Sequence, residues 1–202
     1  MTDDISGVLI AGGRSRRMGQ DKRFMKVGGA SVFERTLSVL RVTFAENIVV
    51  LAEPIEGLDV QRCPVVYDLI PNAGSLGGLY TGLMTASRSR VFAVACDMPF
   101  LDPEVIRFML SQGESADVIV ANLGGRFQPM HAVYSKRCVP FLQAMAQRNE
   151  LKIQNLFHQN ALRMKILTEN HLQAFGPGFR SFQNINTPSE LASAEASPSI
   201  HP

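Results

Sequence analysis

The sequence has no tryptophan, and aromatic residues make up only 7% of its 202 positions. Proteins that bind single-stranded nucleic acids stack the bases on aromatic side chains, so this class of protein is not expected here. The net charge of +2 at pH 7 is also too small for the strongly basic surface of a DNA-binding domain. We therefore expect no nucleic-acid partner.

Cysteine and long apolar runs are scarce as well. Cys63, Cys96 and Cys138 are the only cysteines, and their odd number and wide spacing argue against a disulfide framework or a structural zinc site. No apolar run approaches the roughly 20 residues of a membrane span, and the acidic N-terminus differs from a signal peptide. These absences predict a cytoplasmic protein with reduced thiols and no membrane partner.

Hydrophobic residues make up 46% of the chain, which is typical of a globular protein. Short apolar segments alternate with segments of helical period, and this alternation predicts an α/β fold with a mostly parallel sheet. The expected strands are 6–13 with its glycine-rich turn, 46–53, 63–68, 90–100, 116–123, 130–135 and 163–168. The expected helices are 31–44, 76–87, 103–112, 138–148, 150–159 and 187–195. We expect a single domain over residues 1–196 and a frayed tail at 197–202.

The segment from Ile10 to Lys22 joins a glycine-rich turn to a cluster of basic residues. Gly12 and Gly13 directly follow a buried strand, at the carboxyl end where open α/β sheets bind ligands. Amides of such a turn together with cations cradle anions, and the cations here are Arg14, Arg16, Arg17, Lys22, Arg23 and Lys26. The spacing matches neither the Walker A nor the GxGxxG pattern. We interpret the segment as a polyphosphate site; for the basic residues alone, a solvated loop or a nucleic-acid patch is the alternative.

A second candidate is Asp97, which lies near the end of the long apolar segment 90–100, two residues before Pro99. Mg²⁺ is usually held by one or two carboxylates together with substrate phosphates, so Asp97 beside a phosphate loop is a candidate magnesium ligand. The alternative is a turn-forming aspartate that bonds its own backbone. Asp102 precedes Pro103, and this pair is typical of a helix cap.

Further polar groups follow later strands. Asp68 ends the strand 63–68, and a glycine-rich stretch (Gly74, Gly77 and Gly78) leads into a helix whose free amides could meet an anion or a base edge. A flexible, glycine-tolerant loop is the alternative for this stretch.

Asn184 and Asn186 lie two residues apart, so an extended chain would point both to one side. Their amides could ligate a cation or hold a phosphate, although each could also serve as a turn or cap residue. His131 shows no ligand spacing, and we expect it to be packed or to line a pocket rather than to act as a base.

Four segments in this order and spacing resemble the molybdenum cofactor guanylyltransferases, which are MobA-like nucleotidyltransferases. The segments are IAGGRSRRMGQDK, CDMPFL, QPMHAVYS and FQNINTPSEL, and the resemblance extends from about Gly7 to about Leu191. It implies a glycosyltransferase-A-like fold of three layers, with helices on both faces of a mostly parallel mixed sheet. It also implies transfer of GMP from GTP to the phosphate of molybdenum-molybdopterin, with Mg²⁺ as cofactor and release of pyrophosphate. Other cofactor-biosynthesis proteins and recipient molybdoenzymes are the further partners that it implies.

The resemblance also implies residue roles. The nucleotide-binding positions are Ile10, Ala11, Gly12, Gly13, Lys22, Asp68 and Asp97. The catalytic positions are Lys22, Asp97 and Arg17, with Asp97 as the magnesium ligand. The substrate-binding positions are Asn184, Asn186 and Gln128.

The chemistry needs no general base, because the attacking phosphate is already ionised. Catalysis is then mainly charge neutralisation and in-line positioning, which agrees with the lack of a convincing catalytic histidine, cysteine or serine. Two kinds of alternative remain. One is a related enzyme that uses CTP or acts on a sugar or polyol phosphate. The other is a non-catalytic molybdopterin carrier, against which the presence of Lys22 and Asp97 argues.

Overall fold

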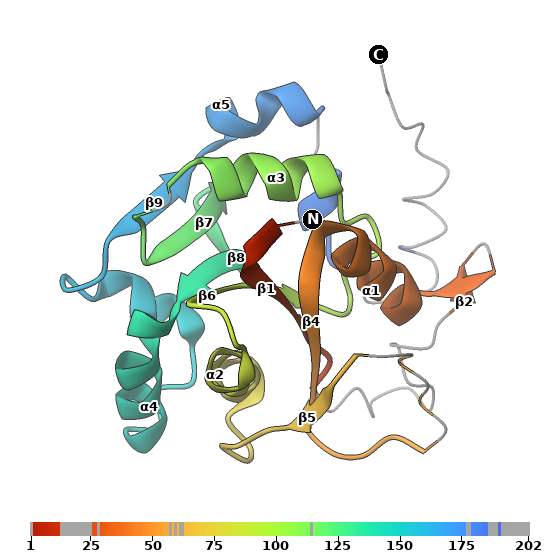
Figure 1. Ribbon diagram of the computed structural model, residues 1–202. Helices are drawn as coiled ribbons and strands as arrows, with labels where there is room; N and C mark the ends of the chain where they lie inside the picture. Colours follow the sequence, from red (N-terminus) through yellow and green to blue (C-terminus); the bar gives the residue numbers. More distant parts are fainter. Residues whose placement is uncertain are drawn as a thin grey trace.

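The computed structural model describes residues 2–12, 26–27, 29–56, 58, 60, 63–113, 115–176, 179–185 and 190. Within them the chain forms a seven-stranded sheet in the order β5-β4-β1-β6-β8-β7-β9 (Figure 1). The strands are β1 (Thr2–Ile10), β4 (Phe44–Leu51), β5 (Val65–Tyr67), β6 (Arg90–Ala95), β7 (Val118–Leu123), β8 (Arg126–Ser135) and β9 (Met164–Leu167). In this sheet β8 runs antiparallel to both of its neighbours, and the other pairs are parallel. The predicted mostly parallel mixed sheet is confirmed.

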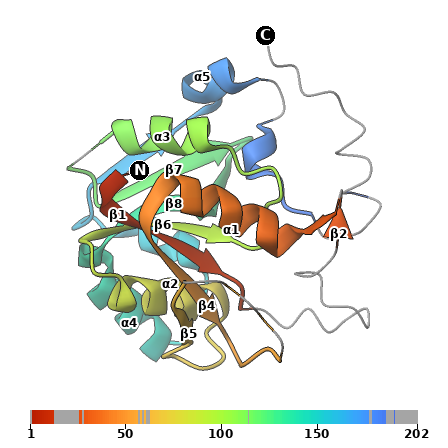
Figure 2. The same cartoon turned by 45° about the vertical axis from the view of Figure 1, so that its right-hand side comes forward.

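Helices cover both faces of the sheet. On one face α1 (Val32–Thr43) packs on β1 and β4 and against α3 (Pro103–Ser111). On the other face α2 (Gly74–Thr85) packs on β1, β4 and β6 and against α4 (Val139–Gln147) (Figures 1 and 2). Buried apolar side chains form two clusters, as expected for a three-layer fold. None of the helices in the described ranges is long and apolar enough to cross a membrane.

Local signals explain where these helices start. Ser31 caps α1 and forms a reciprocal capping box with Glu34, which satisfies amides at the start of the helix. Asp102 caps α3 by accepting a hydrogen bond from the Glu104 amide, with Pro103 in the first turn, so the predicted cap is confirmed. In α2, Gly78 and Gly82 face the sheet. A Cβ atom on either would come within 2.6 Å of the Ile10 or Val8 side chain, so these glycines let α2 pack closely on β1.

The largest differences from the prediction lie in five segments. β1 starts four residues before the expected position 6, and β6 ends at Ala95 rather than at residue 100. The expected α-helix at 150–159 is a 3₁₀-helix, η4 (Ile153–His158); its two buried residues, Ile153 and Leu156, lie three apart and eclipse at three residues per turn. β8 starts four residues before the expected 130, because Gly124 and Gly125 adopt positive φ angles and close a β7–β8 hairpin. A small hairpin of β2 (Lys26–Val27) and β3 (Ala30–Ser31) was not predicted. The shorter elements are η3 (Lys136–Cys138), α5 (Glu169–Leu172), η5 (Gln173–Phe175) and η6 (Arg180–Phe182).

The ends of the parallel strands define two edges of the sheet. We use the term carboxyl edge for the residues that follow β1, β4, β5 and β6, namely 11–12, 52–56, 68–70 and 96–100. Backbone bonds continue the sheet into this edge, from the Ala11 amide to the Val50 carbonyl (2.9 Å) and from the Cys96 amide to the Ile10 carbonyl (3.2 Å). The amino edge contains the residues just before β7 and β9 and the end of β8. Ligands of open α/β sheets bind at the carboxyl edge.

Candidate functional site

Asp68 lies at the carboxyl edge directly after β5, where its amide donates to the Leu51 carbonyl (3.0 Å). The side chain is half-buried, and its Oδ1 atom is covered but has no hydrogen-bond partner among the described residues. Burial raises the pKa of Asp68 from 3.8 to about 6, because desolvation disfavours the charged form. Such a carboxylate is available to a ligand that brings its own hydrogen-bond donors.

Two glycines keep space open beside this carboxylate. A Cβ atom on Gly12 would lie 3.5 Å from Asp68 Oδ2 and 3.2 Å from the Ala52 amide nitrogen. A Cβ atom on Gly77 would lie 3.9 Å from Asp68 Cγ and 2.9 Å from the Ile70 carbonyl oxygen. The structure thus brings Gly12 and Asp68, two of the predicted site residues, together at one edge of the sheet. Ile10 and Ala11 are buried in the core, so only their backbone could contact a ligand.

Thr81 also supports this end of the site, and sequence reasoning missed it. Its hydroxyl accepts a hydrogen bond from the Leu69 amide (2.9 Å) and donates to the Gly77 carbonyl (2.8 Å). The residue after Asp68 is therefore tied to the first turns of α2. No local pattern marks a single threonine inside a helix for this role.

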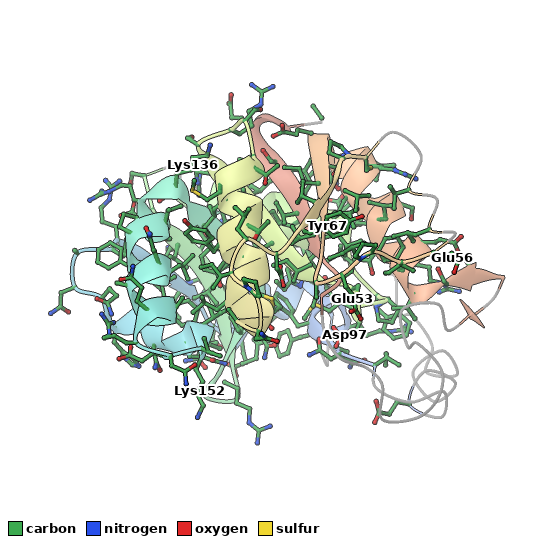
Figure 3. All side chains as sticks on the ribbon, turned by 90° about the horizontal axis from the view of Figure 1, so that it is seen from below. Glu53, Glu56, Tyr67, Asp97, Lys136 and Lys152 are labelled. Carbon is green, nitrogen blue, oxygen red and sulfur yellow. The ribbon has the colours of Figure 1, made fainter. Side chains whose placement is uncertain are left out.

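Asp97 occupies the same edge, after β6. Its carbonyl accepts a hydrogen bond from the Ile185 amide (2.9 Å), and the next carbonyl, of Met98, accepts from the Thr36 hydroxyl (3.1 Å). The turn that carries Asp97 is thus held from α1 on one side and from residue 185 on the other. Figure 3 labels Asp97 together with Glu53, which follows β4, and Tyr67, which ends β5.

The two carboxylates follow strands that are not neighbours. Strands β4 and β1 lie between β5, which precedes Asp68, and β6, which precedes Asp97. The Asp68 side chain reaches across this edge towards Gly12, which follows β1. The described residues contain no group of three or more His, Cys, Asp or Glu side chains suited to a metal. A single carboxylate fits a cation such as Mg²⁺ that takes its other ligands from phosphates and water.

Gln128 and Asn184 also reach this edge. His131 pairs with Val94 near the end of β6, so Gln128, three residues earlier on the antiparallel β8, lies beyond β6 in the direction of Asp97. The Gln128 amide donates to the Arg126 carbonyl (3.4 Å). Asn184 is exposed and precedes Ile185, the residue that bonds to Asp97. Gly13, Arg17, Lys22 and Asn186 lie outside the described residues, as do the tail 197–202 and, apart from residue 190, the expected helix 187–195.

His131 is a core residue, as expected. Its ring is fully buried, stacked on Phe182 with 4.1 Å between ring centroids and edge-on to Phe92 at 5.2 Å. Nδ1 lies 3.1 Å from the Ser181 carbonyl oxygen, so the proton of the neutral ring belongs on Nδ1, which donates to this acceptor. Burial lowers the pKa of His131 to about 3. The ring is therefore neutral at physiological pH.

Residues 7–163 match the family described as the MobA-like NTP transferase domain. The chain belongs to this family. A probable molybdenum cofactor guanylyltransferase of Pelotomaculum thermopropionicum is 38% identical over 94% of this chain and 91% of its own. Further curated relatives with the guanylyltransferase name are 29–34% identical.

Solved structures share the MobA-like fold. Molybdopterin-guanine dinucleotide biosynthesis protein A from Archaeoglobus fulgidus superposes with a TM-score of 0.81 at 23% identity, covering 95% of this chain and 97% of its own. Rv0371c of Mycobacterium tuberculosis, solved in complex with manganese, has a TM-score of 0.65 at 18% identity and covers 82% of this chain and 88% of its own. The predicted fold class is confirmed.

The candidate site at the carboxyl edge has two chemically different ends. At one end, Asp68 offers an acceptor between two glycines. At the other end, Asp97, Gln128 and Asn184 offer oxygen and amide groups that suit a cation and phosphates. This arrangement suits a ligand that has a donor-rich group at one end and anionic groups at the other.

Proposed function

We propose that this protein transfers GMP from GTP to the phosphate of molybdenum-molybdopterin, forming molybdopterin guanine dinucleotide and releasing pyrophosphate. The observation that carries the choice of nucleotide is the covered Oδ1 of Asp68, which has no partner among the described residues. Guanine presents two adjacent donors, N1–H and N2–H, and a carboxylate accepts two parallel hydrogen bonds. The base-pairing edges of adenine and cytosine each place an acceptor where guanine has N1–H. The names of the curated relatives support the same activity.

The acceptor phosphate supplies the nucleophile. Its oxygen forms a bond to the α-phosphorus of GTP, the bond from that phosphorus to the α–β bridging oxygen breaks, and pyrophosphate leaves with the electron pair. We assign Lys22 and Arg17 to the charges of the triphosphate, and the backbone of Ile10 to Gly13 to the nucleotide. No side chain has to remove a proton, because the attacking oxygen is already ionised. Positioning and charge neutralisation then supply the rate enhancement.

We assign Asp97 to a divalent cation, with Mg²⁺ as the cation of choice. When bound, the cation would neutralise charge on the α-phosphate and on the leaving pyrophosphate. The single carboxylate and the manganese complex of Rv0371c support this assignment. We assign Asn184, Asn186 and Gln128 to the acceptor. Three free cysteines support a reducing compartment, so we place the reaction in the cytoplasm, with recipient molybdoenzymes as the consumers of its product.

The test is a competition assay. Molybdenum-molybdopterin and Mg²⁺ are offered with GTP, CTP or ATP, and pyrophosphate release and the dinucleotide product are measured. We expect GTP to be favoured at least tenfold, or about 1.4 kcal/mol, and the preference to fall in Asp68→Asn. A preference for CTP, or no pyrophosphate release with any nucleotide, would contradict the proposal.

A further inference from the structure

Four aromatic rings form a row across the protein, from the amino end of β4 to residue 182. Phe44 stacks on Phe92 (5.6 Å between centroids), Phe92 meets His131 edge-on (5.2 Å), and His131 stacks on Phe182 (4.1 Å). β1 lies between the strands that carry Phe44 and Phe92. There Gly7 pairs with Phe92, and a Cβ atom on Gly7 would come within 2.8 Å of the Phe44 ring. The absence of a side chain at position 7 lets the first two rings meet.

The last ring belongs to the segment 179–185, which joins the carboxyl edge at several points. The Ser181 hydroxyl accepts a hydrogen bond from the Asp102 amide (3.1 Å), and the Ser181 carbonyl accepts one from His131 Nδ1 (3.1 Å). The Arg180 guanidinium lies over the Phe100 ring, 4.5 Å from its centroid. The Ile185 amide donates to the Asp97 carbonyl. Figures 1 and 2 show the η6 turn of this segment in dark blue near α1 and α3.

Asn184 depends on these contacts for its position. It is exposed, whereas Phe182 and Ile185 on either side of it are buried. Phe182 supplies the largest buried side chain of the segment, and its ring contact is a stack with 24° between the ring planes. A stacked ring restricts rotation and sliding of the chain that carries it more than a flexible aliphatic side chain does. The orientation of residues 183–185 relative to Asp97 is therefore set two residues earlier.

We propose that Phe182 is a positioning residue for phosphate transfer: its stack on His131 holds the segment 179–185 so that Asn184 and Asp97 face the same acceptor phosphate. This inference rests on the proposed function. Phe182 does not touch the reacting groups and acts through Asn184 and the Asp97 turn. The stack is the feature that matters. The second ring nitrogen of His131, Nε2, is buried and has no hydrogen-bond partner among the described residues, so it makes no hydrogen bond that a phenylalanine would lose. A phenylalanine in place of His131 would keep two stacked rings.

The row provides its own control. Phe182→Leu and Phe44→Leu each remove one stacked ring from an end of the same row, but only Phe182 lies next to the carboxyl edge. We expect both variants to lose thermal stability. Only Phe182→Leu should lower kcat for GMP transfer, by about 10–100-fold, which is the scale for a small misplacement of reacting groups. The KM for GTP should stay within about twofold, because none of the contacts described for the segment 179–185 involves Asp68.

A second readout needs no turnover. Hydrogen exchange measured by mass spectrometry should show faster exchange of the peptide 179–185 in Phe182→Leu, by at least about tenfold, with β1 unchanged. Phe44→Leu should leave the 179–185 peptide as in the parent. If the parent protein fails to transfer GMP, the proposed function is wrong, whereas the exchange measurement still decides whether the stack holds the segment.

His131→Phe separates the stack from the hydrogen bond. It keeps two facing rings and removes the donor to Ser181, and we expect kcat within about threefold of the parent. If Phe182→Leu does not fold, Phe182→Met replaces it in the same comparison. Equal kcat in Phe182→Leu and Phe44→Leu, unchanged exchange at 179–185, or a loss in His131→Phe as large as that in Phe182→Leu would each overturn the proposal.

Discussion

Asp117 at the amino edge and Asp68 at the carboxyl edge are both covered carboxylates, but their surroundings are opposite. Asp117 accepts hydrogen bonds from the Arg163 amide (2.9 Å), the Ser135 hydroxyl (3.2 Å) and the Arg137 guanidinium (3.4 Å). Burial alone would raise the pKa of Asp117, yet these donors and the arginine charges hold it below 3.8. Among the described residues no such donor reaches Asp68 Oδ1, and burial raises the pKa of Asp68 to about 6.

This difference separates a structural carboxylate from one that is available to a ligand. Asp117 lies directly before β7 and is bonded to Ser135 at the end of β8 and to Arg163 just before β9, so its hydrogen bonds are used within the fold. Asp68 and Asp97 lie at the edge where four parallel strands end, and in our proposal they face the substrate. Substitutions at the two edges should accordingly affect different measurements.

The largest expected effect on the carboxyl edge is that of Asp97→Asn. The variant keeps the shape of the side chain and one ligand oxygen but removes the charge that Mg²⁺ prefers. Turnover should fall by about 10²–10³-fold, the scale for one lost transition-state charge partner, while the melting temperature stays near that of the parent. Initial rates over a Mg²⁺ titration, paired with thermal melts, check this. Full activity with an unchanged metal requirement would remove Asp97 as the ligand.

Asp117→Asn should give the opposite pattern at the amino edge. The amide carries no charge for the two arginines and accepts fewer hydrogen bonds, so the free energy of unfolding should fall by about 2–3 kcal/mol. The kcat per folded molecule should not change, because no proposed site residue contacts Asp117. Urea unfolding and assays corrected for the folded fraction measure the two quantities. Arg126→Gln, a change to an exposed residue, serves as a control for charge loss alone.

Asp68→Asn should act on nucleotide binding with little effect on stability. Its amide can donate where guanine also donates, so one of two hydrogen bonds is lost and the KM for GTP should rise about tenfold. The melting temperature should be unchanged or slightly higher, since a desolvated charge is removed. Saturation curves for GTP at fixed acceptor check the first expectation. An unchanged KM would mean that guanine does not meet Asp68.

The smallest expected effect is the pH dependence of GTP binding. Donors from guanine favour ionised Asp68, so affinity should be constant above pH 7 and weaken as the carboxyl is protonated below about 6, by roughly fourfold at pH 5.5. Asp68→Asn should abolish this dependence. The two carboxylates change the free energy of unfolding in opposite directions as the pH falls. Ionised Asp68 destabilises the fold, and this penalty disappears as the pH falls from 6 towards 3.8. Ionised Asp117 stabilises the fold, and this contribution is lost as the pH falls below 3.8 through its lowered pKa.

The seven strands could be predicted because each carries a compact apolar run, and the meeting of Asp68 with Gly12 could be inferred because parallel strands end at one edge. The β7–β8 hairpin had a signal in Gly124-Gly125 that was not used. The 3₁₀ form of 153–158 had none, since a three-residue apolar spacing also fits an α-helix. The ring row joins residues from four distant elements, and local periodicity contains no information about such a contact.

The hydrogen bond from the Asp102 amide to the Ser181 hydroxyl joins residues that are 79 positions apart. At the usual 5–20 residues per second, a ribosome takes roughly 4–16 s to add the second partner after the first. During this interval the growing chain already has β1, β4, β5 and β6, but not the segment that reaches Asp97. A nascent chain is therefore expected to form the Asp68 end of the candidate site before the segment 179–185 can bond to Asp97, so translation order would delay completion of the site until the fold is closed.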